Sequence, residues 1–513
     1  MRRASLLTFV EVAVVAAWIV LAGISLTRST DDSGTLIPID VDALVTGTMS
    51  EEWMGIYVED QKVGYAFTGT ARTVEGGKLI QSRSAYRMML FGELREIVQA
   101  GVAVVDGEGR LQRFDVLVQS AAANLAARGE VRGDTLMLEV LQAGEASTIE
   151  IDIDEPPQIG LTLADHLARA SENDLKEGQV FEVPYFSPTM LAKSNMTVRV
   201  IGTEILPDGN EAFWVERDFE GIVSRTLINR GGDTLREEMS GGGLPIWSVR
   251  ETREQAVKMP DDQEPVDFIA LSAVPLKGYL KNPRERMSLS LAVTGVGLDR
   301  IFSQPPLQTL TDDRVIISVP MKAELPSPEV ADSSPAMAEF LVATPFMPVD
   351  HRDIQAQSAK TLGGIGDRKE AVQALVDWTY KYLEKTPVVG VPNALEVLQV
   401  GKGDCNEHTS LFVALARAGG IPARIAAGLV YSDRVSNTGA FYYHAWPEVW
   451  FGEETGWVPV DPTFGQFPAD ATHVKIVEGD LARQIELMGV MGRIGFELIK
   501  DETPEGSAGS QPE

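Results

Sequence analysis

The chain has 513 residues, 44% of them hydrophobic and 23% charged, which is the composition of a globular protein and excludes a collagen-like or largely disordered chain. At roughly 100–200 residues per domain, this length indicates about two to four domains. Acidic residues outnumber basic ones by 74 to 45, and the formal charge of −29 repels phosphate backbones, so we expect no nucleic-acid partner. The charge serves solubility in the simplest interpretation, and a cationic partner is the alternative.

A long apolar segment opens the chain. Residues Leu6 to Leu26 are almost continuously apolar, and a helix of that length spans ~30 Å, the thickness of a bilayer core. Arg2 and Arg3 precede the segment, and by the positive-inside rule they place the bulk of the chain outside the cytoplasm. We therefore predict a single-pass membrane protein, tethered by one N-terminal helix, with its bulk in the periplasm or at the cell surface. A cleaved signal peptide is the rival interpretation, but its apolar core is usually ~7–15 residues and no clear A-x-A site follows here.

Short alternating strands follow a polar linker. The alternation of apolar and polar residues predicts antiparallel strands, with turns at Asp106-Gly107 and at Pro207-Asp208-Gly209. A helical pattern near His166 interrupts them and is expected on or beside the sheet. A Pro- and Asp-rich break at 260–265 separates this region from a few further strands.

Helical spacing replaces alternation near Asp350. A helix is indicated by the apolar residues Val372, Leu375, Val376, Tyr380 and Leu383. A further helix is predicted to begin at Cys405 and to stop at Gly419-Gly420. Strands are expected next in ARIAAGLVYS, YYHAWPEVWF and GWVPVDPT.

Cys405 is the only cysteine in the sequence, so no disulfide forms within the chain. It follows a glycine-rich turn at a predicted helix start, where the macrodipole and unpaired backbone N–H groups stabilise a thiolate. The same N–H groups are suited to an oxyanion hole. We therefore expect a reactive thiol with a lowered pKa, against the alternative of a buried, inert cysteine.

Thiolate chemistry needs a base, and the base needs an orienting group. His444 and Asp461 lie on successive predicted strands, and an antiparallel pair can bring them together on one face. His408, three residues after Cys405, is an alternative base that we interpret as structural, because it shares the helix turn of the cysteine. The remaining histidines, which have no comparable partner nearby, are interpreted as ordinary: His166, His351 and His473.

Two other kinds of site are disfavoured. One cysteine and no close histidine pair do not match zinc spacings, so we expect no metal, and nothing indicates a cofactor. Serine-based catalysis lacks a G-x-S-x-G elbow.

The segments GKGDCNEHTSLFVALARAGGIPARIAAGLVY, HAWPEVWF and GWVPVDPTFG resemble the transglutaminase-like superfamily in order and spacing, over roughly residues 350 to 475. This resemblance implies a papain-like core in which Cys405 is the nucleophile, His444 the base and acid, and Asp461 the orienting group. For the second oxyanion donor it suggests Gln399, while Trp378 is better explained as core. Trp446, beside His444, is expected either to wall the cleft or to belong to the core.

The resulting fold class is multidomain α+β, with an N-terminal transmembrane helix, an antiparallel β-rich region and a C-terminal papain-like domain. The expected parts are a signal anchor (1–30), a linker (31–48), a β-rich extracytoplasmic domain (49–259), a small β module (266–345), the transglutaminase-like catalytic domain (346–480), and a C-terminal helix or strand with a disordered tail (481–513).

The expected function is a thiol enzyme that acts on amide bonds of proteins or peptides through a thioester at Cys405, with a peptidase or amidase favoured. A transglutaminase that cross-links Gln to Lys is one alternative. A non-catalytic binding module and a purely structural β-rich envelope protein are the others.

Overall fold

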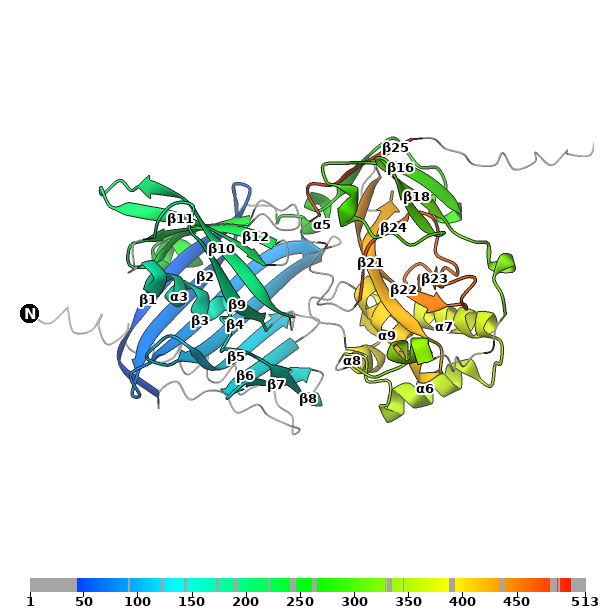
Figure 1. Ribbon diagram of the computed structural model, residues 1–513, viewed down its shortest axis with the longest axis horizontal. Helices are drawn as coiled ribbons and strands as arrows, with labels where there is room; N and C mark the ends of the chain where they lie inside the picture. The colour runs from blue at the N-terminus through cyan, green and yellow to red at the C-terminus, as the bar shows by residue number, and fades with distance from the viewer. Residues whose placement is uncertain are drawn as a thin grey trace, which may run out of the picture.

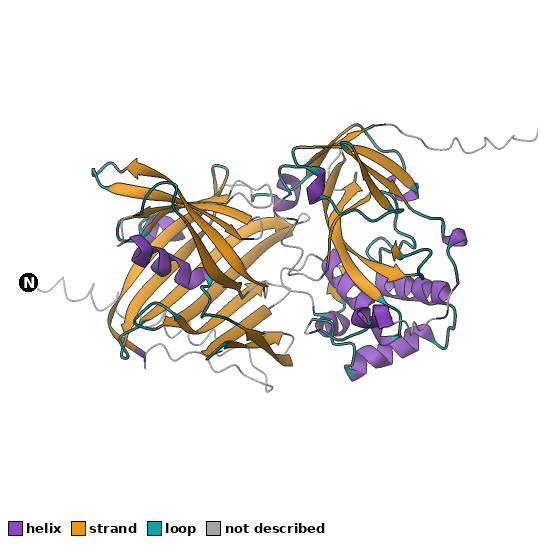
Figure 2. Cartoon of the chain, in the orientation of Figure 1, coloured by secondary structure: helices purple, strands orange, loops and turns teal. Residues whose placement is uncertain are grey.

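The computed structural model describes residues 44–499, apart from short gaps at 91–92, 121–123, 143–144, 172–174, 189–191, 220–221, 240–245, 261–264, 328, 330–334, 345, 387–392, 434–438, 480–486 and 488–489. The chain forms two lobes that lie side by side (Figure 1). Strands dominate the N-terminal lobe, whereas the C-terminal lobe combines strands with most of the longer helices (Figure 2).

The N-terminal lobe is one fourteen-stranded antiparallel sheet in the order β8-β7-β6-β5-β4-β3-β2-β1-β14-β13-β12-β11-β10-β9. Its strands are β1 (Val45–Val58), β2 (Gln61–Thr73), β3 (Lys78–Leu90), β4 (Glu93–Val105), β5 (Leu111–Ser120), β6 (Asn124–Arg132), β7 (Thr135–Gln142), β8 (Glu145–Asp152), β9 (Val180–Ser187), β10 (Ala192–Ile205), β11 (Glu211–Phe219), β12 (Ile222–Asn229), β13 (Thr234–Met239) and β14 (Ile246–Arg250). Asp106 Oδ1 accepts hydrogen bonds from the N–H groups of Glu108 and Arg110 and so closes the tight turn between β4 and β5.

Helix α3 (Gly160–Ser171) links the two edge strands of this sheet and lies against it. Leu163 and Leu167 of α3 are buried among apolar side chains of β9 to β12. The curved sheet visible in Figure 1 thus has a core on the side that faces α3. Two short helices, α4 (Arg253–Val257) and α5 (Phe268–Leu271), follow the sheet.

The C-terminal lobe is built on a nine-stranded sheet in the order β17-β18-β16-β25-β15-β22-β21-β24, with β23 paired to β22. Its strands are β15 (Val274–Lys277), β16 (Ser288–Thr294), β17 (Gln308–Thr311), β18 (Arg314–Ser318), β21 (Ala423–Ser432), β22 (Ala440–Trp450), β23 (Trp457–Pro459), β24 (His473–Glu478) and β25 (Gly495–Leu498). Two-residue strands β19 (Glu384–Lys385) and β20 (Lys402–Gly403) pair separately. Four 3₁₀ turns occur in this lobe: η1 (Pro283–Glu285), η2 (Leu298–Arg300), η3 (Lys322–Glu324) and η4 (Pro335–Phe340).

The helices of this lobe are α6 (Arg352–Leu362), α7 (Arg368–Tyr382), α8 (Ala394–Val400) and α9 (Cys405–Ala418). Helix α9 is surrounded by α6, α7 and α8 on one side and by β21 and β22 on the other. Its residues from Leu411 to Ala416 are all fully buried, which is the pattern of a helix that is apolar all round. This central position fixes the start of α9 against the sheet.

The fold class expected from the sequence needs correction. A multidomain α+β fold was expected, whereas the chain is β-rich and its largest element is the fourteen-stranded antiparallel sheet. Within residues 44–499, as far as they are described, no helix combines the length and the apolar character needed to cross a membrane. The run from Leu6 to Leu26, on which the predicted transmembrane helix rested, lies outside the described residues. The single-pass membrane topology and the extracytoplasmic location are therefore not retained.

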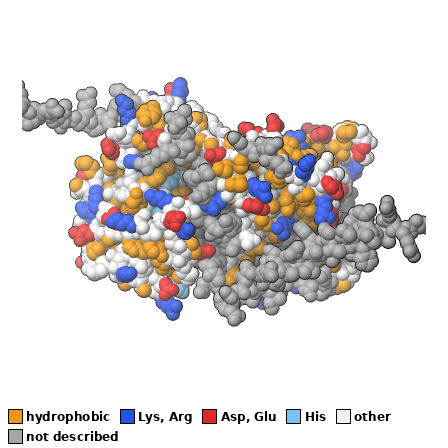
Figure 3. All heavy atoms as spheres, turned by 180° about the vertical axis from the view of Figure 1, so that it is seen from behind, with side chains coloured by type: hydrophobic (Ala, Val, Ile, Leu, Met, Phe, Trp, Pro, Cys, Tyr) orange, Lys and Arg blue, Asp and Glu red, His pale blue; other side chains and the backbone are white. Residues whose placement is uncertain are grey.

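Charged side chains of both signs are interspersed over the face seen in Figure 3, among the residues that are coloured there. On this face the acidic excess forms no single large patch.

Candidate functional site

The start of α9 positions Cys405. Asp404 is the N-cap residue, and its carboxylate accepts a hydrogen bond from the N–H of Asn406 at 3.0 Å. Glu407 completes a capping box by accepting from the N–H of Asp404 at 2.8 Å. Cys405 is therefore the first residue of the helix, as its sequence context predicts, and it is half-buried.

The start of α9 packs against a stretch of β22 that has no strand partner on that edge among the described residues. On one edge β22 pairs with β21 along its whole length. On the other edge it pairs with β15 only near Phe441 and with β23 only from Glu448 onward. The helix start fills the interval, where the hydroxyl of Thr409 donates to the carbonyl of Ala445 at 3.0 Å and the Cys405 thiol lies against the Ala445 N–H. Cys405 is thereby held beside the residue that follows His444.

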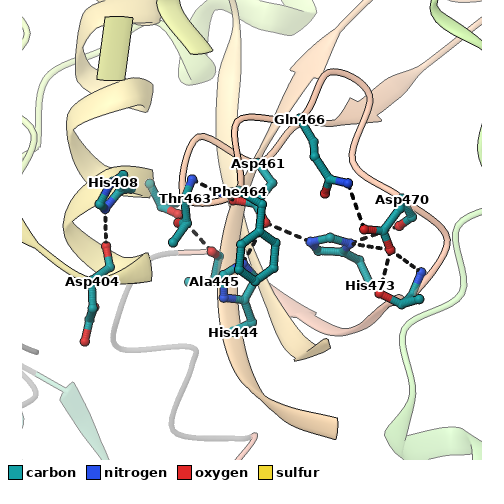
Figure 4. A network of polar contacts seen from close by, with 12 residues as sticks. Asp404, His408, His444, Ala445, Asp461, Thr463, Phe464, Gln466, Asp470 and His473 are labelled. Atoms are coloured by element: carbon teal, nitrogen blue, oxygen red, sulfur yellow. Dashed lines mark hydrogen bonds and ion pairs between the residues drawn. The ribbon is translucent and has the colours of Figure 1, made fainter. Parts of the chain in front are cut away.

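On the same strand, the side chain of His444 contacts Asp461. Nε2 of His444 lies 2.9 Å from Oδ2 of Asp461, and both side chains are buried. The ring of Phe464 stacks on the imidazole with centroids 4.9 Å apart and planes 9° apart. Because Nε2 is engaged by the carboxylate, Nδ1 is the nitrogen that remains for a proton exchange. The structure thus pairs His444 with Asp461 and places Cys405 against the residue that follows His444 (Figure 4 shows the histidine and the aspartate).

Asp461 also has a partner that the sequence analysis set aside. Nε2 of His473, at the start of β24, lies 3.0 Å from the same Oδ2 atom. Nδ1 of His473 lies 2.9 Å from the backbone carbonyl of Asp470. Figure 4 shows the network from Asp461 through His473 to Asp470, and Arg284 binds the Asp470 carboxylate at 2.8 Å. His473 was interpreted as ordinary because no comparable partner lies beside it in the sequence.

The pKa values in this network have clear causes. Burial would favour neutral Asp461, but the two histidines outweigh it and hold the pKa of Asp461 well below its usual range. Burial opposes a charge on His473 as well, yet the carboxylates of Asp470 and Asp461 raise its pKa to about 9. The pKa of Asp470 is lowered against the effect of burial, by His473 first and then by Arg284.

The Cys405 thiol differs from the expectation. Burial raises the pKa of the thiol, and the nearby carboxylates of Asp404, Glu407 and Asp461 raise it further, whereas the Ala445 N–H lowers it. The expected effect of the helix start fails because Asp404 occupies the positive end of the dipole with its own negative charge. The predicted lowering of the thiol pKa was therefore wrong. Glu407 is buried beside Asp404, and the pKa of its carboxyl is raised well above the usual range.

The other residues singled out in the sequence have different surroundings. Gln399 is on an exposed position of α8. Trp378 stacks on Tyr382 and packs against the core of the lobe. Trp446 is buried next to both His444 and His473, with ring centroids at 6.2 and 5.1 Å.

The remaining histidines have different surroundings. His408 is fully buried, and its Nδ1 lies 2.6 Å from the Asp404 carbonyl. Its Nε2 has no hydrogen-bond partner among the described residues, and burial lowers its pKa. His351 caps α6, where its Nδ1 accepts from the N–H of Asp353. His166 lies on α3, in the other lobe.

The donor atoms of His444, Asp461 and His473 lie within 4.8 Å of one another, which is close enough for a metal site by geometry alone. Both imidazole nitrogens, however, lie at hydrogen-bond distance from one shared carboxylate oxygen. Hydrogen bonding therefore accounts for the cluster, and we assign no metal to it.

A hollow of about 440 Å³ lies on the outer side of Phe464. Its wall contains the exposed aromatic residues Tyr380 and Phe464, and two cations, Lys385 and Arg284, lie over those rings at 4.0 and 4.3 Å. Since Phe464 also stacks on His444, this hollow borders the site.

Part of the chain matches a known protein family. Residues 355–462 match the model of the transglutaminase-like superfamily. This segment is a transglutaminase-like core. The match includes all three of Cys405, His444 and Asp461 and ends just before Phe464.

Two curated proteins are similar to parts of the chain. A protein-glutamine gamma-glutamyltransferase of Pseudomonas aeruginosa is 33% identical over 97 residues, which are 17% of this chain and 14% of that protein. An uncharacterized protein of Mycobacterium leprae is 31% identical over 130 residues, 24% of this chain and 45% of that protein. The chain thus spans less than half the length of either curated relative.

Among solved structures, the periplasmic domain of TgpA from Pseudomonas aeruginosa aligns over 37% of this chain and 88% of its own, with a TM-score of 0.24 and 17% identity. A β-barrel-like protein of Brucella abortus, from a family of unknown function, aligns over 40% of this chain and 97% of its own, with a TM-score of 0.33 and 12% identity. Similarity at this level says nothing about activity.

Proposed function

We propose that the protein is a thiol-dependent acyl-transfer enzyme that acts on amide groups of proteins or peptides through a thioester at Cys405. The observation that supports this proposal is the meeting of the α9 start with the β22 edge, where the Cys405 thiol lies against the N–H of Ala445, the residue after His444, while His444 is bonded to Asp461. Covalent acyl transfer by a thiol requires a nucleophile, a base and a group that orients the base within one site.

In the first half-reaction the Cys405 sulfur attacks the amide carbonyl carbon, and its proton moves to Nδ1 of His444. The tetrahedral intermediate then breaks its C–N bond, and His444 returns the proton to the departing nitrogen, which leaves as ammonia or as an amine. Asp461 holds Nε2–H of His444 at 2.9 Å throughout and stabilises the transient imidazolium. The acyl group remains on Cys405 as a thioester.

In the second half-reaction an acceptor attacks the thioester carbon and gives its proton to His444. The Cys405 sulfur leaves and regains the proton. Water as acceptor gives net hydrolysis, whereas a primary amine gives a new amide. Hydrolysis is the primary proposal, and transfer to an amine is the second, supported by the name of the Pseudomonas aeruginosa relative, a protein-glutamine gamma-glutamyltransferase.

The test uses the whole protein with a glutamine-containing peptide, in the presence and absence of a fluorescent primary amine. Ammonia release or peptide cleavage without amine supports hydrolysis, and amine incorporation supports transfer. A covalent mass on Cys405 after rapid acid quench supports the thioester in either case. We expect Cys405→Ala and His444→Ala to abolish turnover, Asp461→Asn to reduce it strongly, and Asp350→Asn, an exposed matched control, to leave it unchanged.

A folded wild-type protein that forms neither product, and whose Cys405 never carries an acyl group from a panel of protein and peptide amides, would refute catalysis. That result would favour the non-catalytic binding module considered from the sequence.

A further inference from the structure

Asp461 has every acceptor position filled. Its Oδ1 accepts from the backbone N–H groups of Thr463 at 2.7 Å and Phe464 at 3.0 Å. Its Oδ2 faces the Nε2 atoms of His444 at 2.9 Å and His473 at 3.0 Å. An ionised carboxylate offers about four lone-pair sites, so four donors saturate it. A group held by four bonds has no freedom to rotate.

The partners of His473 determine its protonation. Nε2 faces the Asp461 carboxylate, and Nδ1 faces the backbone carbonyl of Asp470. A carbonyl oxygen and an ionised carboxylate accept hydrogen bonds and cannot donate them. Both ring nitrogens must therefore carry protons, and His473 is an imidazolium cation. Its neutral form would leave one of two buried contacts without a proton.

The surroundings of His473 support a fixed cation. The ring is buried, and the edge-on ring of Trp446 lies against it with centroids 5.1 Å apart. The Asp470 carboxylate lies 3.6 Å from Nδ1 and is itself bound by Arg284, by Gln466 and by the N–H and hydroxyl of Thr472. The charged or titratable groups that face the ring are thus Asp461, Asp470 and His444, with Arg284 behind Asp470.

We propose that His473 is a positioning residue of the acyl-transfer site: as an imidazolium it locks the Asp461 carboxylate that orients His444. This inference rests on the proposed function. It also assigns an electrostatic role to His473, because its positive charge balances the buried charge of Asp461. The orienting unit is then a neutral pair, Asp461 with His473, rather than a lone buried anion.

A purely structural histidine would give a different outcome from a positioning residue. Loss of a structural side chain would lower stability without altering the bond between His444 and Asp461 in protein that remains folded. Loss of a positioning residue would loosen that bond and slow the chemical step, while substrate binding would change little.

The experiment compares wild type, His473→Gln and His473→Ala, with His351→Gln as a control outside the network. Each variant is first checked for its fold by circular dichroism at a temperature well below its melting point. Nitrogen-edited NMR of the imidazole rings then reports the ring N–H groups. In wild type we expect two N–H signals from His473 up to about pH 8, and a protected Nε2–H signal from His444.

In His473→Ala we expect the protected His444 signal to broaden or vanish, and kcat to fall about 10–100-fold with KM within about twofold, the range seen when a partner that orients a functional histidine is removed. His473→Gln supplies an amide N–H without a charge, so it should restore part of the His444 signal and of kcat. His351→Gln should leave the His444 signal and kcat as in wild type.

Two results would overturn the proposal. One is a wild-type His473 with a single ring N–H at pH 7. The other is a folded His473→Ala variant that keeps the protected His444 signal unchanged. Both are read without turnover, so they remain decisive if no amide substrate is processed. An intact NMR signature in a protein without acyl transfer would refute the proposed function and leave the positioning of His444 established.

Discussion

Burial and two carboxylates at the start of α9 raise the pKa of the Cys405 thiol. Burial is the largest cause of its raised thiol pKa, and Asp404 is the next. Asp404→Asn removes the charge but keeps a side chain that caps helices well. We therefore expect the alkylation profile of this variant to move to lower pH, with faster labelling at pH 7 than wild type.

The measurement is the rate of iodoacetamide labelling from pH 6 to 10, which is unambiguous because Cys405 is the only cysteine. Wild type should label slowly at pH 6 and gain rate through the alkaline range. Asp350→Asn, on an exposed position, controls for a general change in charge. Fast wild-type labelling at pH 6, or an unmoved profile in Asp404→Asn, would contradict this account of the thiol.

Stability should report the charge of His473 independently. The pKa of His473 is raised from 6.5 to about 9 in the folded protein, so its protonated form stabilises the fold. This contribution is fully present below pH 6.5, the value for the unfolded chain, and is lost as pH rises towards 9. At about 1.4 kcal/mol for each pKa unit, the free energy of unfolding should fall by up to about 3 kcal/mol over that interval.

Denaturant unfolding at pH 6.5, 7.5 and 9 measures this effect, and His473→Gln should show a much flatter dependence. The pKa values of Asp461 and Asp470 are lowered in the folded protein, so these two groups affect stability at acidic pH. Their ionised carboxylates stabilise the fold above pH 4, and that contribution is lost as the pH falls below 4. Equal alkaline slopes for wild type and His473→Gln would show that His473 is not the titrating group.

At the scale of elements, β21 sets the spacing between the two histidine strands. Gly428 of β21 pairs with His444 on β22 and with Lys475 on β24, next to a bulge. A Cβ atom at this glycine would lie 2.0 Å from the Val474 carbonyl, which is backbone and has to move. Gly428→Ala should therefore push β24, and His473 with it, away from Asp461.

We expect Gly428→Ala to cost about 1–3 kcal/mol of stability, the usual range for overpacking, and to lower kcat more than KM. Gly366→Ala is the matched control in the same lobe, because its Cβ would meet no atom within 4 Å and its φ is not in the left-handed region. Thermal melts and steady-state kinetics of both variants provide the test. Equal behaviour of the two alanine variants would show that the contact at Gly428 has no consequence for β24.

Local signals explain which elements could be predicted from the sequence. The capping residues and the glycine stop define α9, and the alternation of apolar and polar residues places His444 on a strand. These elements and the transglutaminase-like resemblance could therefore be predicted from the sequence. His473 was missed because its partners come from another strand and from a loop. A usable signal did exist in Asp470 and Thr472, since an aspartate three residues before a histidine at a strand start marks a turn that engages the ring.

At the scale of the whole molecule, the pairing of strands that lie far apart in the chain could not be predicted from the sequence pattern. Strand β25, at the C-terminal end of the described chain, inserts between β15 and β16. It is the link in the strand order that joins β16, β17 and β18 to the strands that carry His444 and His473. Such an insertion leaves no local signature, because the four residues of β25 pair with partners about two hundred positions earlier.

We therefore expect the strands before the transglutaminase-like core to unfold together with it, and β25 to be required for that cooperativity. A chain that ends at Ile494 loses β25, including Phe496. The side chain of Phe496 is 2% exposed, and its ring packs on that of Phe441 with centroids 4.8 Å apart. Removal of one buried phenylalanine side chain costs about 3–5 kcal/mol, so Phe496→Ala should lose that amount of stability and the shortened chain should lose more.

A chain that ends at Ile499 keeps β25 and is the control, with unfolding expected as in the full chain. Denaturant unfolding followed by tryptophan fluorescence should show one transition for the control and either a lower midpoint or two transitions for the chain that ends at Ile494. An unchanged single transition in the latter would mean that the sheet holds together without β25.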